Sequence, residues 1–399
     1  MKPKRSIKRF LRSSVYYIHL LLGLSVGLYL LVMGLTGSIL VFHEQINETL
    51  TPQFHELDLT PQQLSQIDNT QGIERVHQIG TDLYPDRDIA RIYLSKDAHV
   101  YVMYINRPDN TDNLGWGDQI REVAVHPITY QVLGDRPYYG TFFNFIYAVH
   151  MHWLAKIPGW FFNGFASIFA ILLLASGLWL WWPGLKPKLF KQRFKINLQS
   201  IRRLAWDIHG LLGATSLIFL IVTTITGSYI IFKPIVDAII PQPQTVAAEV
   251  DLNAPIQPLG QMLTTAQQQR DDIEIYGALF LKAPVDKPQR VNFVGRPTDE
   301  SVPGRYTITL ARQGGVIMRI SDRTGSNQPL GSVLMDWSTW LHFGTWAGPF
   351  SQAFYVLLGF VPSVLFISGL YLYLKKRQSR RKFKLARKQQ EASLESAAS

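Results

Sequence analysis

The chain has 399 residues, of which 47% are hydrophobic and 17% are charged, and its formal net charge is +11. It contains no cysteine, which excludes disulfides, iron–sulfur clusters, thiolate catalysis and covalently attached haem. The positive charge does not indicate nucleic-acid binding, because many of the basic residues flank apolar segments, where they suit anionic lipid headgroups.

Four apolar stretches carry no charged residue, and each has about the 20 residues that a helix needs to cross a bilayer. The first is longer than the apolar core of a signal peptide and lacks a clear cleavage site, so we expect it to be retained. The sequence therefore predicts four membrane spans. They are roughly Tyr17–Phe42, Trp160–Trp182, Ile208–Phe232 and Phe350–Leu374.

The distribution of basic residues predicts the orientation in the membrane. The N-terminal tail, the link 183–204 and the stretch 375–388 are rich in Lys and Arg and contain no Asp or Glu, which places them in the cytoplasm by the positive-inside rule. Both termini then lie inside, and the two long loops lie outside, in the periplasm of a Gram-negative bacterium.

The predicted fold class is an α-helical membrane bundle of four spans with two small α+β modules outside it. Each long loop combines a polar helix with alternating strands, as in ARIYLSKDAHVYVMYI and RVNFVGRP. The expected order is cytoplasmic tail and first span (1–42), module 1 (43–142), outer helix and second span (143–182), basic loop (183–204), third span (205–232), module 2 (233–336), outer helix and fourth span (337–374), and basic tail (375–399).

The membrane segments repeat within the chain. YIHLLLGLSVGLYLLVMGLTGSILVF (17–42) aligns without a gap with DIHGLLGATSLIFLIVTTITGSYIIF (207–232), so His19 falls on His209; in the later spans His150 falls on His342. Each half contributes two spans, so the halves are parallel repeats about an axis along the membrane normal. This symmetry places His19 level with His209 near the cytoplasmic face, and His150 level with His342 near the outer face.

Two level histidine pairs favour iron ligation. A polar side chain inside a span tends to face the bundle and to serve a function, and a haem held by two histidines requires imidazoles at matched depth. Gly23 and Gly213 follow their histidines by one helical turn, where they would either leave room for a flat porphyrin or permit close helix packing.

Two further histidines compete for these roles. His152 is about 200° around a helix from His150, so both cannot point at one iron. We assign His150 because it has a counterpart in the second half; His152 aligns with Gly344. His43 is about 36 Å along a helix from His19 and is expected at the interface. Replacement of an assigned ligand by either residue stays open.

The whole pattern resembles the PepSY-associated transmembrane family, which includes inner-membrane ferric-siderophore reductases. The resemblance covers nearly the whole chain and depends on IHLLLGLSVGLYLLVMGLTGSILVF, AVHMHWL, ASGLWLWWPG, DIHGLLG, TGS, WLHFGTW and ISGLYLYL. In one departure, His126 stands where a PepSY turn usually has Asp, and this turn lacks the usual Gly.

The resemblance implies PepSY modules in the periplasm, two b-type haems and electron transfer across the inner membrane to Fe(III) in a siderophore, which releases Fe(II). The implied activity is that of an oxidoreductase, a ferric-chelate reductase, with a quinol or a cytoplasmic reductase as electron donor. Carried over residue by residue, the axial iron ligands are His19, His209, His150 and His342; no catalytic residue is assigned. The alternatives are a membrane-tethered regulator of an envelope peptidase, and a haem protein that passes electrons to another periplasmic acceptor.

Overall fold

The structure is a computed structural model that describes residues 7–95, 99–106, 120–182, 187–239, 249–284, 286–299, 301–302 and 304–398. The chain divides into two compact units. We call Met1–Val41, Trp160–Ile231 and Ser338–Ser399 the helical unit, and Phe42–Gly159 with Phe232–Trp337 the sheet unit. Parts of the predicted basic segments, residues 1–6 and 183–186, lie outside the described residues.

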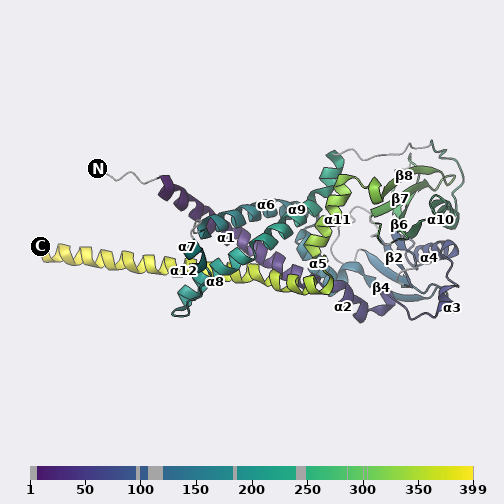
Figure 1. Cartoon of the computed structure of the whole chain (residues 1–399). Coiled ribbons are helices and arrows are strands. Elements are labelled where there is room, and N and C mark those ends of the chain that lie inside the picture. Colours follow the sequence, from purple (N-terminus) through teal and green to yellow (C-terminus); the bar gives the residue numbers. More distant parts are fainter. Residues whose placement is uncertain are drawn as a thin grey trace. The chain divides into compact units, whose positions relative to one another are not determined.

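The helical unit contains the predicted membrane spans (Figure 1). Four described helices are long and apolar enough to cross a membrane, within Arg9–Leu40, Ile157–Trp181, Leu217–Ile235 and Gly348–Glu391, which confirms the predicted number of spans. The basic tail continues the last of them as a helix. The helices are α1 (Ile7–Leu40), α6 (Lys156–Trp181), α7 (Pro187–Gln192), α8 (Ile201–Thr215), α9 (Leu217–Ile239, which ends in the sheet unit) and α12 (Gly348–Ala398).

The third apolar stretch differs from the prediction of one continuous helix. It is interrupted at Ser216, which separates α8 from α9. The Leu212 carbonyl accepts hydrogen bonds from both the hydroxyl and the backbone N–H of Ser216, at 2.6 and 3.0 Å. His209 consequently lies on the shorter helix α8 rather than on the span itself.

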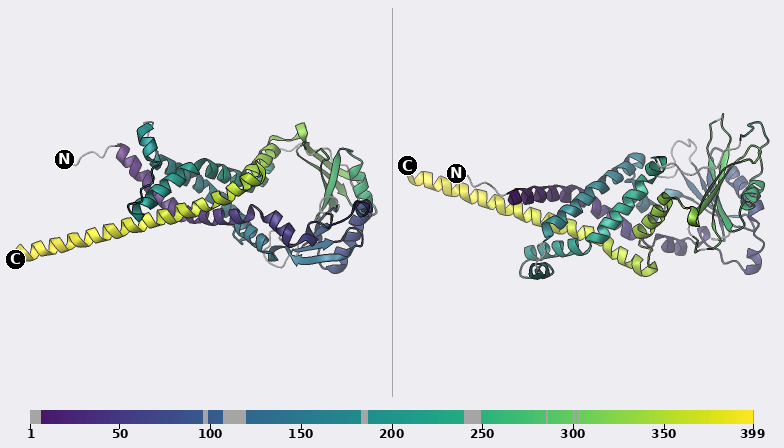
Figure 2. Two further views of the ribbon diagram at one scale, coloured as in Figure 1. Left: turned by 60° about the horizontal axis from the view of Figure 1, so that its bottom comes forward. Right: turned by 45° about the horizontal axis from the view of Figure 1, so that its top comes forward.

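The bundle packs most closely where small residues meet. α12 lies along α1 and also contacts α8 (Figure 2). A Cβ added at Gly34 of α1 would lie 2.3 Å from the Gly359 carbonyl oxygen of α12, so the two backbones are in direct contact. The Ser38 hydroxyl donates across the same interface to the Val356 carbonyl at 2.8 Å. Small residues and interhelical hydrogen bonds of this kind are what associate helices in lipid.

The strands form a single antiparallel sheet of eight in the order β4-β3-β2-β1-β5-β6-β7-β8. The two predicted modules each contribute four consecutive strands, and they are joined edge to edge because β1 pairs with β5 through Ile92 and Ala278. The strands are β1 (Ile89–Tyr93), β2 (Tyr101–Ile105), β3 (Arg121–Val125), β4 (Val132–Pro137), β5 (Ile273–Leu281), β6 (Arg290–Pro297), β7 (Gly304–Ala311) and β8 (Ile317–Thr324).

One hydrophobic core spans both modules. The helices α4 (Asn69–Leu83) and α10 (Leu259–Gln267) pack against each other, and Ile73 and Leu263 from them join Ile92 and Phe293 from the strands, all fully buried. The modules expected as two bodies therefore share one sheet and one core. The pairing of β1 with β5 also covers the strand edge that each module would expose by itself.

The turn between β3 and β4 explains the departure at His126. Its Nδ1 accepts hydrogen bonds from the backbone N–H groups of Ile128 and Thr129 at 3.1 and 3.3 Å, as an Asp side chain does in such turns. Tyr130 takes the left-handed conformation, with φ 58°, at a position that usually suits glycine. His126 thus has a structural role in this turn.

Short helices precede the second and fourth spans, as the sequence predicts. α5 (Phe142–His152) ends at Trp153, which has φ 53°, before α6 begins. α11 (Leu330–Phe343) ends at Gly344, which has φ 71°, before α12. The other short elements are α2 (His43–Leu50), η1 (Pro52–Phe54), α3 (Pro61–Leu64), η2 (Tyr138–Gly140) and η3 (Gly325–Asn327).

Candidate functional site

His19 of α1 and His209 of α8 lie together in the helical unit. Their ring centroids are 6.3 Å apart and their planes are perpendicular. A bond from imidazole nitrogen to a metal is about 2 Å long, so two imidazoles on one metal place their ring centroids about 6 Å apart. The separation of this pair therefore fits a single metal ion between the two rings.

The Nδ1 edge of His19 is hydrogen-bonded to α6. Nδ1 lies 3.0 Å from the Ser176 hydroxyl and 3.3 Å from the Leu173 carbonyl oxygen. The Ser176 hydroxyl donates its own hydrogen to the Leu173 carbonyl at 2.8 Å, so toward His19 its oxygen can only accept. Nδ1 must then carry the proton, which leaves the lone pair on Nε2 for a metal.

His209 repeats this arrangement with α12. Its Nδ1 lies 3.0 Å from the Ser368 hydroxyl, which donates to the Val364 carbonyl at 2.6 Å and hence accepts from the imidazole. Ser368 is the counterpart of Ser176 in the second half of the chain. Histidines that bind metals commonly donate the other ring nitrogen to an oxygen acceptor, which fixes both tautomer and ring orientation.

His342 of α11 makes the same type of contact with α9. Its Nδ1 lies 3.0 Å from the Thr223 carbonyl oxygen and 3.4 Å from the Thr226 hydroxyl. The Thr226 hydroxyl donates to the Val222 carbonyl at 2.7 Å, so it too is an acceptor for the imidazole. His342 therefore also keeps its Nε2 lone pair.

Three glycines make room for these rings. A Cβ added at Gly177 would lie 3.1 Å from Cε1 of His19, and one at Gly369 would lie 3.2 Å from Cε1 of His209. At Gly227 the distance to Cε1 of His342 would be only 2.7 Å. Glycine thus allows each imidazole to lie directly against the helix that holds its Nδ1.

Gly23 and Gly213 each lie beside one leucine side chain rather than against a neighbouring helix backbone. A Cβ added at Gly23 would meet only Leu173 Cδ1, at 4.0 Å, and one at Gly213 only Leu365 Cδ2, at 3.7 Å. Helix-packing glycines in this bundle are far more crowded, as Gly34 is. Of the two readings of the sequence, space for a flat ligand beside each histidine is the one that these contacts favour.

His150 lies on α5 in the sheet unit, whereas His342 belongs to the helical unit. The second predicted pair is therefore not brought together within one compact unit. On the same helix, the side chain of His152 is buried, with 4% of its surface exposed, and His150 is half-buried. His43 begins α2 in the sheet unit, and its ring lies 6.5 Å from that of Phe143.

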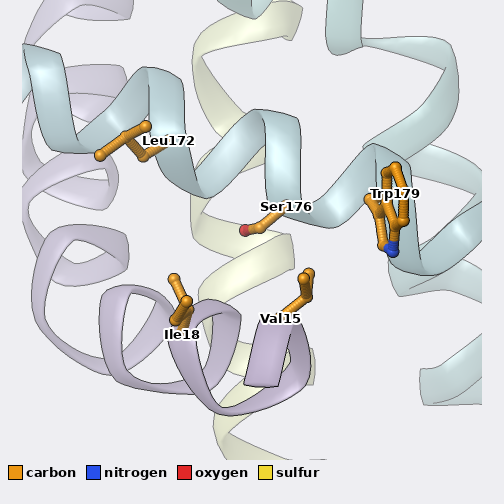
Figure 3. A pocket seen from close by; sticks show the side chains of 5 residues that line it. All are labelled: Val15, Ile18, Leu172, Ser176 and Trp179. Atoms are coloured by element: carbon orange, nitrogen blue, oxygen red, sulfur yellow. The ribbon is translucent and has the colours of Figure 1, made fainter. Parts of the chain in front are cut away.

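A pocket of about 340 Å³ lies between α1 and α6 (Figure 3). Val15 and Ile18 of α1 line it together with Leu172, Ser176 and Trp179 of α6. The surface that the pocket exposes is apolar; Ser176 contributes to it, although its hydroxyl is bonded to the Leu173 carbonyl and to His19. An apolar molecule in this pocket would lie next to Ser176.

No cluster of three or more His, Asp or Glu residues with metal-binding geometry occurs in the described part of the chain. The indication of a metal at His19 and His209 is therefore the geometry of two imidazoles, not a cluster of three or more ligands.

A comparison with protein-family models shows the family of the chain. The model of the PepSY-associated transmembrane region matches residues 16–376. The chain belongs to this family. No curated protein gives a significant match to it. The matched region includes both histidine-bearing halves and the eight strands of the sheet.

The hydroxyl residues that hold the imidazoles were not predicted as functional. Ser176 and Ser368 occur in the repeated Ser-Gly-Leu, and Thr226 occurs in the repeated Thr-Gly-Ser. Each lies directly before a glycine that contacts the same imidazole. The pairing of a small hydroxyl residue with glycine, repeated in both halves, is the signal in the sequence that could have identified them.

Proposed function

We propose that this PepSY-associated protein transfers electrons across a bacterial inner membrane through two b-type haems and reduces Fe(III) in a periplasmic siderophore, which releases Fe(II). The observation that carries the proposal is the opposed pair His19 and His209, with a centroid separation of 6.3 Å and both Nδ1 atoms already hydrogen-bonded. A haem bound by both imidazoles has no free coordination position and supplies outer-sphere transfer of one electron at a time.

The chain's own residues would hold and orient this group. Ser176 and Ser368 keep the imidazoles in the tautomer that has its lone pair on Nε2. Gly23 and Gly213 leave space on the helix face one turn after each histidine. By the internal repeat, His342 and His150 would form the corresponding outer pair, and His342 has the same Nδ1 contacts.

The electron donor would be a quinol or a cytoplasmic reductase. The pocket beside Ser176 favours a small apolar donor, because four of its five lining residues are apolar and it lies against the His19 site. A quinol bound there would be oxidised to the quinone by losing two protons and two electrons, one electron at a time, to a group that His19 and His209 would hold.

Visible absorption of the purified full-length protein tests the proposal. We expect b-type Soret and α bands that dithionite reduces, with two haems per chain. Ferric siderophore added to the reduced protein should restore the oxidised spectrum, with Fe(II) trapped by a chromogenic chelator. A protein without reducible b-type bands would exclude the haem hypothesis and leave the peptidase-regulator alternative.

Histidine variants test the ligand assignment. H19A, H209A and the double variant H19A/H209A should each keep one haem, whereas H209A/H342A should keep none. H150A and H152A form a matched pair on α5: the first should remove one haem and the second should remove neither. Loss of a haem in H152A but not in H150A would move the ligand role to His152.

A further inference from the structure

One face of the eight-stranded sheet lies opposite the core formed with α4 and α10. Residues paired directly across antiparallel strands point to the same face. The register therefore places on this face a row that crosses the whole sheet, from Arg136 on β4 through Tyr104 and Arg91 to Asn292, Thr309 and Arg319 on β8. We call it the arginine face.

The positive charge of this face is only partly neutralised. Its acidic residues within the described strands are Glu122 and Glu274, and each is already paired, with Arg136 at 2.5 Å and with Arg296 at 3.5 Å respectively. The other arginines make no ion pair within the described part of the chain. They are Arg91, Arg290, Arg305, Arg319 and Arg323.

Four of these arginines lie on β6 to β8, where no described acidic side chain neutralises their charge. The Nε atoms of Arg290 and Arg319 are removed from solvent and have no hydrogen-bond partner. A buried donor left unsatisfied costs free energy that an acceptor on a ligand would recover. Arg305 and Arg323 lie directly opposite each other on β7 and β8, a placement of like charges that destabilises a sheet. Both features point to an anionic occupant.

The two halves of the arginine face are covered differently. Over β1 to β4, Phe54 packs on Val102 and Ala124, and Ala148 of α5 packs with Ile120 and Tyr104. The corresponding face of β6 to β8 carries none of the described hydrophobic clusters; Arg305 is exposed there, whereas Val294 and Ala311 are buried. This half, which we call the β6–β8 half, adjoins the half on which α5 rests, and α5 carries His150.

We propose that the β6–β8 half of the arginine face binds the Fe(III) chelate through anionic groups, so that the preferred substrates are carboxylate or catecholate chelates. This inference rests on the proposed reductase function. A hydroxamate chelate of Fe(III) is neutral overall, whereas carboxylate and catecholate chelates carry net negative charge. Guanidinium groups bind such oxygens in bidentate fashion.

The dimensions of the face suit a small chelate. Arg290 on β6 and Arg319 on β8 are two strand spacings apart, about 10 Å across the sheet. A chelate held between them would lie beside Asn292 and Thr309, whose side chains are hydrogen-bonded to each other at 2.8 Å. Its iron would then face the same side of the sheet as α5.

Gallium(III) complexes test binding separately from electron transfer, because Ga(III) replaces Fe(III) in these chelates and is not reduced. The probes are Ga(III) citrate, a Ga(III) tris-catecholate and a Ga(III) tris-hydroxamate, titrated calorimetrically into the full-length protein. We expect the two anionic probes to bind more tightly than the neutral one. The double variant R290Q/R319Q should lower the affinity for the anionic probes by about tenfold or more, as expected when charged hydrogen bonds are lost.

Two further variants separate binding from folding. R305Q/R323Q removes the opposed like charges, so it should weaken anionic binding without lowering thermal stability. R75Q, on exposed Arg75 of α4 at the other side of the sheet, should bind like the wild type. Equal affinity for neutral and anionic probes, or unchanged affinity in both double variants, would overturn the inference.

The outcome also separates this inference from the proposed function. If Fe(III) citrate reoxidises the reduced protein equally in wild type and R290Q/R319Q, the function stands and the binding face is wrong. If the gallium probes bind as expected but no ferric chelate reoxidises the protein, the anion-binding face stands and the reductase function is wrong.

Discussion

The imidazoles of His19 and His209 face each other across the bundle, with ring centroids 6.3 Å apart, and each donates Nδ1–H toward a serine of a different helix. Ser176 lies on α6 and Ser368 on α12, so four helices take part in one histidine pair. Fixing both rings before a ligand binds reduces the entropy that binding must overcome.

Removal of the Ser368 hydroxyl should change the redox potential of the haem that we propose between His19 and His209. An acceptor at Nδ1–H makes the imidazole a stronger donor and stabilises Fe(III), so S368A should raise the midpoint potential, by tens of millivolts for a hydrogen bond of about 1 kcal/mol. Potentiometric titration followed in the α band measures it. S332A, which alters a residue of α11 outside the histidine contacts, is the control. An unchanged potential in S368A would contradict the ligand role of His209.

Larger side chains at Gly213 should block the ligand without disturbing the chain. A Cβ there meets only Leu365 Cδ2 at 3.7 Å, so G213L should fold, whereas its branched side chain would fill the space beside His209. We expect G213L to retain one haem, measured as haem content per purified chain. G227L, in contrast, would displace His342 and should affect the other haem. Two haems in G213L would show that the space is not the haem site.

The pairing of β1 with β5 should make the sheet unfold as one unit. Ile92 is fully buried and pairs with both Met103 and Ala278, so I92A should cost about 2 to 5 kcal/mol of unfolding free energy. Hydrogen exchange of the full chain should show loss of protection in β2 and in β6 together. V132A, at a residue that is 42% exposed on the edge strand β4, should have little effect. If I92A lost protection only in β1 to β4, the two modules would unfold independently of each other.

Burial of His77 should make the stability of the sheet unit depend on pH. Burial lowers the pKa of His77 below 6.5, and the positive charge of Arg312 lowers this pKa further, against the opposing effect of Glu74. Below pH 6.5 the unfolded chain takes up a proton that the folded chain does not, so the unfolding free energy should fall as the pH drops, by at most about 1.4 kcal/mol per pH unit.

Hydrogen exchange at pH 7 and pH 5, corrected for intrinsic exchange rates, measures this dependence. The unfolding free energy of H77N should depend less steeply on pH than that of the wild type. The pH dependence that remains in H77N should include a contribution from His55, whose pKa burial also lowers. Identical slopes in H77N and wild type would exclude His77 as the source.

Much of the fold follows from local sequence patterns. The apolar stretches predict the spans because a helix needs about 20 such residues to cross a bilayer, and the breaks around Trp153 and Gly344 coincide with segments rich in glycine and proline. The interruption at Ser216 was not predictable in this way, since the stretch 208–232 is free of charged residues, proline and any other clear helix-breaking signal. The joining of the two modules into one sheet depends on pairing between β1 and β5, which are distant in the chain.

The sequence by itself determined the repeated halves, the four spans and the matched histidines, because these are properties of periodicity and alignment. Only the tertiary structure decided that the ring centroids of His19 and His209 lie 6.3 Å apart, that serines fix their tautomers, and that Gly23 and Gly213 are loosely packed. The physical reason is that distances and hydrogen bonds across helices depend on how the helices are rotated and packed. Sequence spacing along any one helix does not specify that packing.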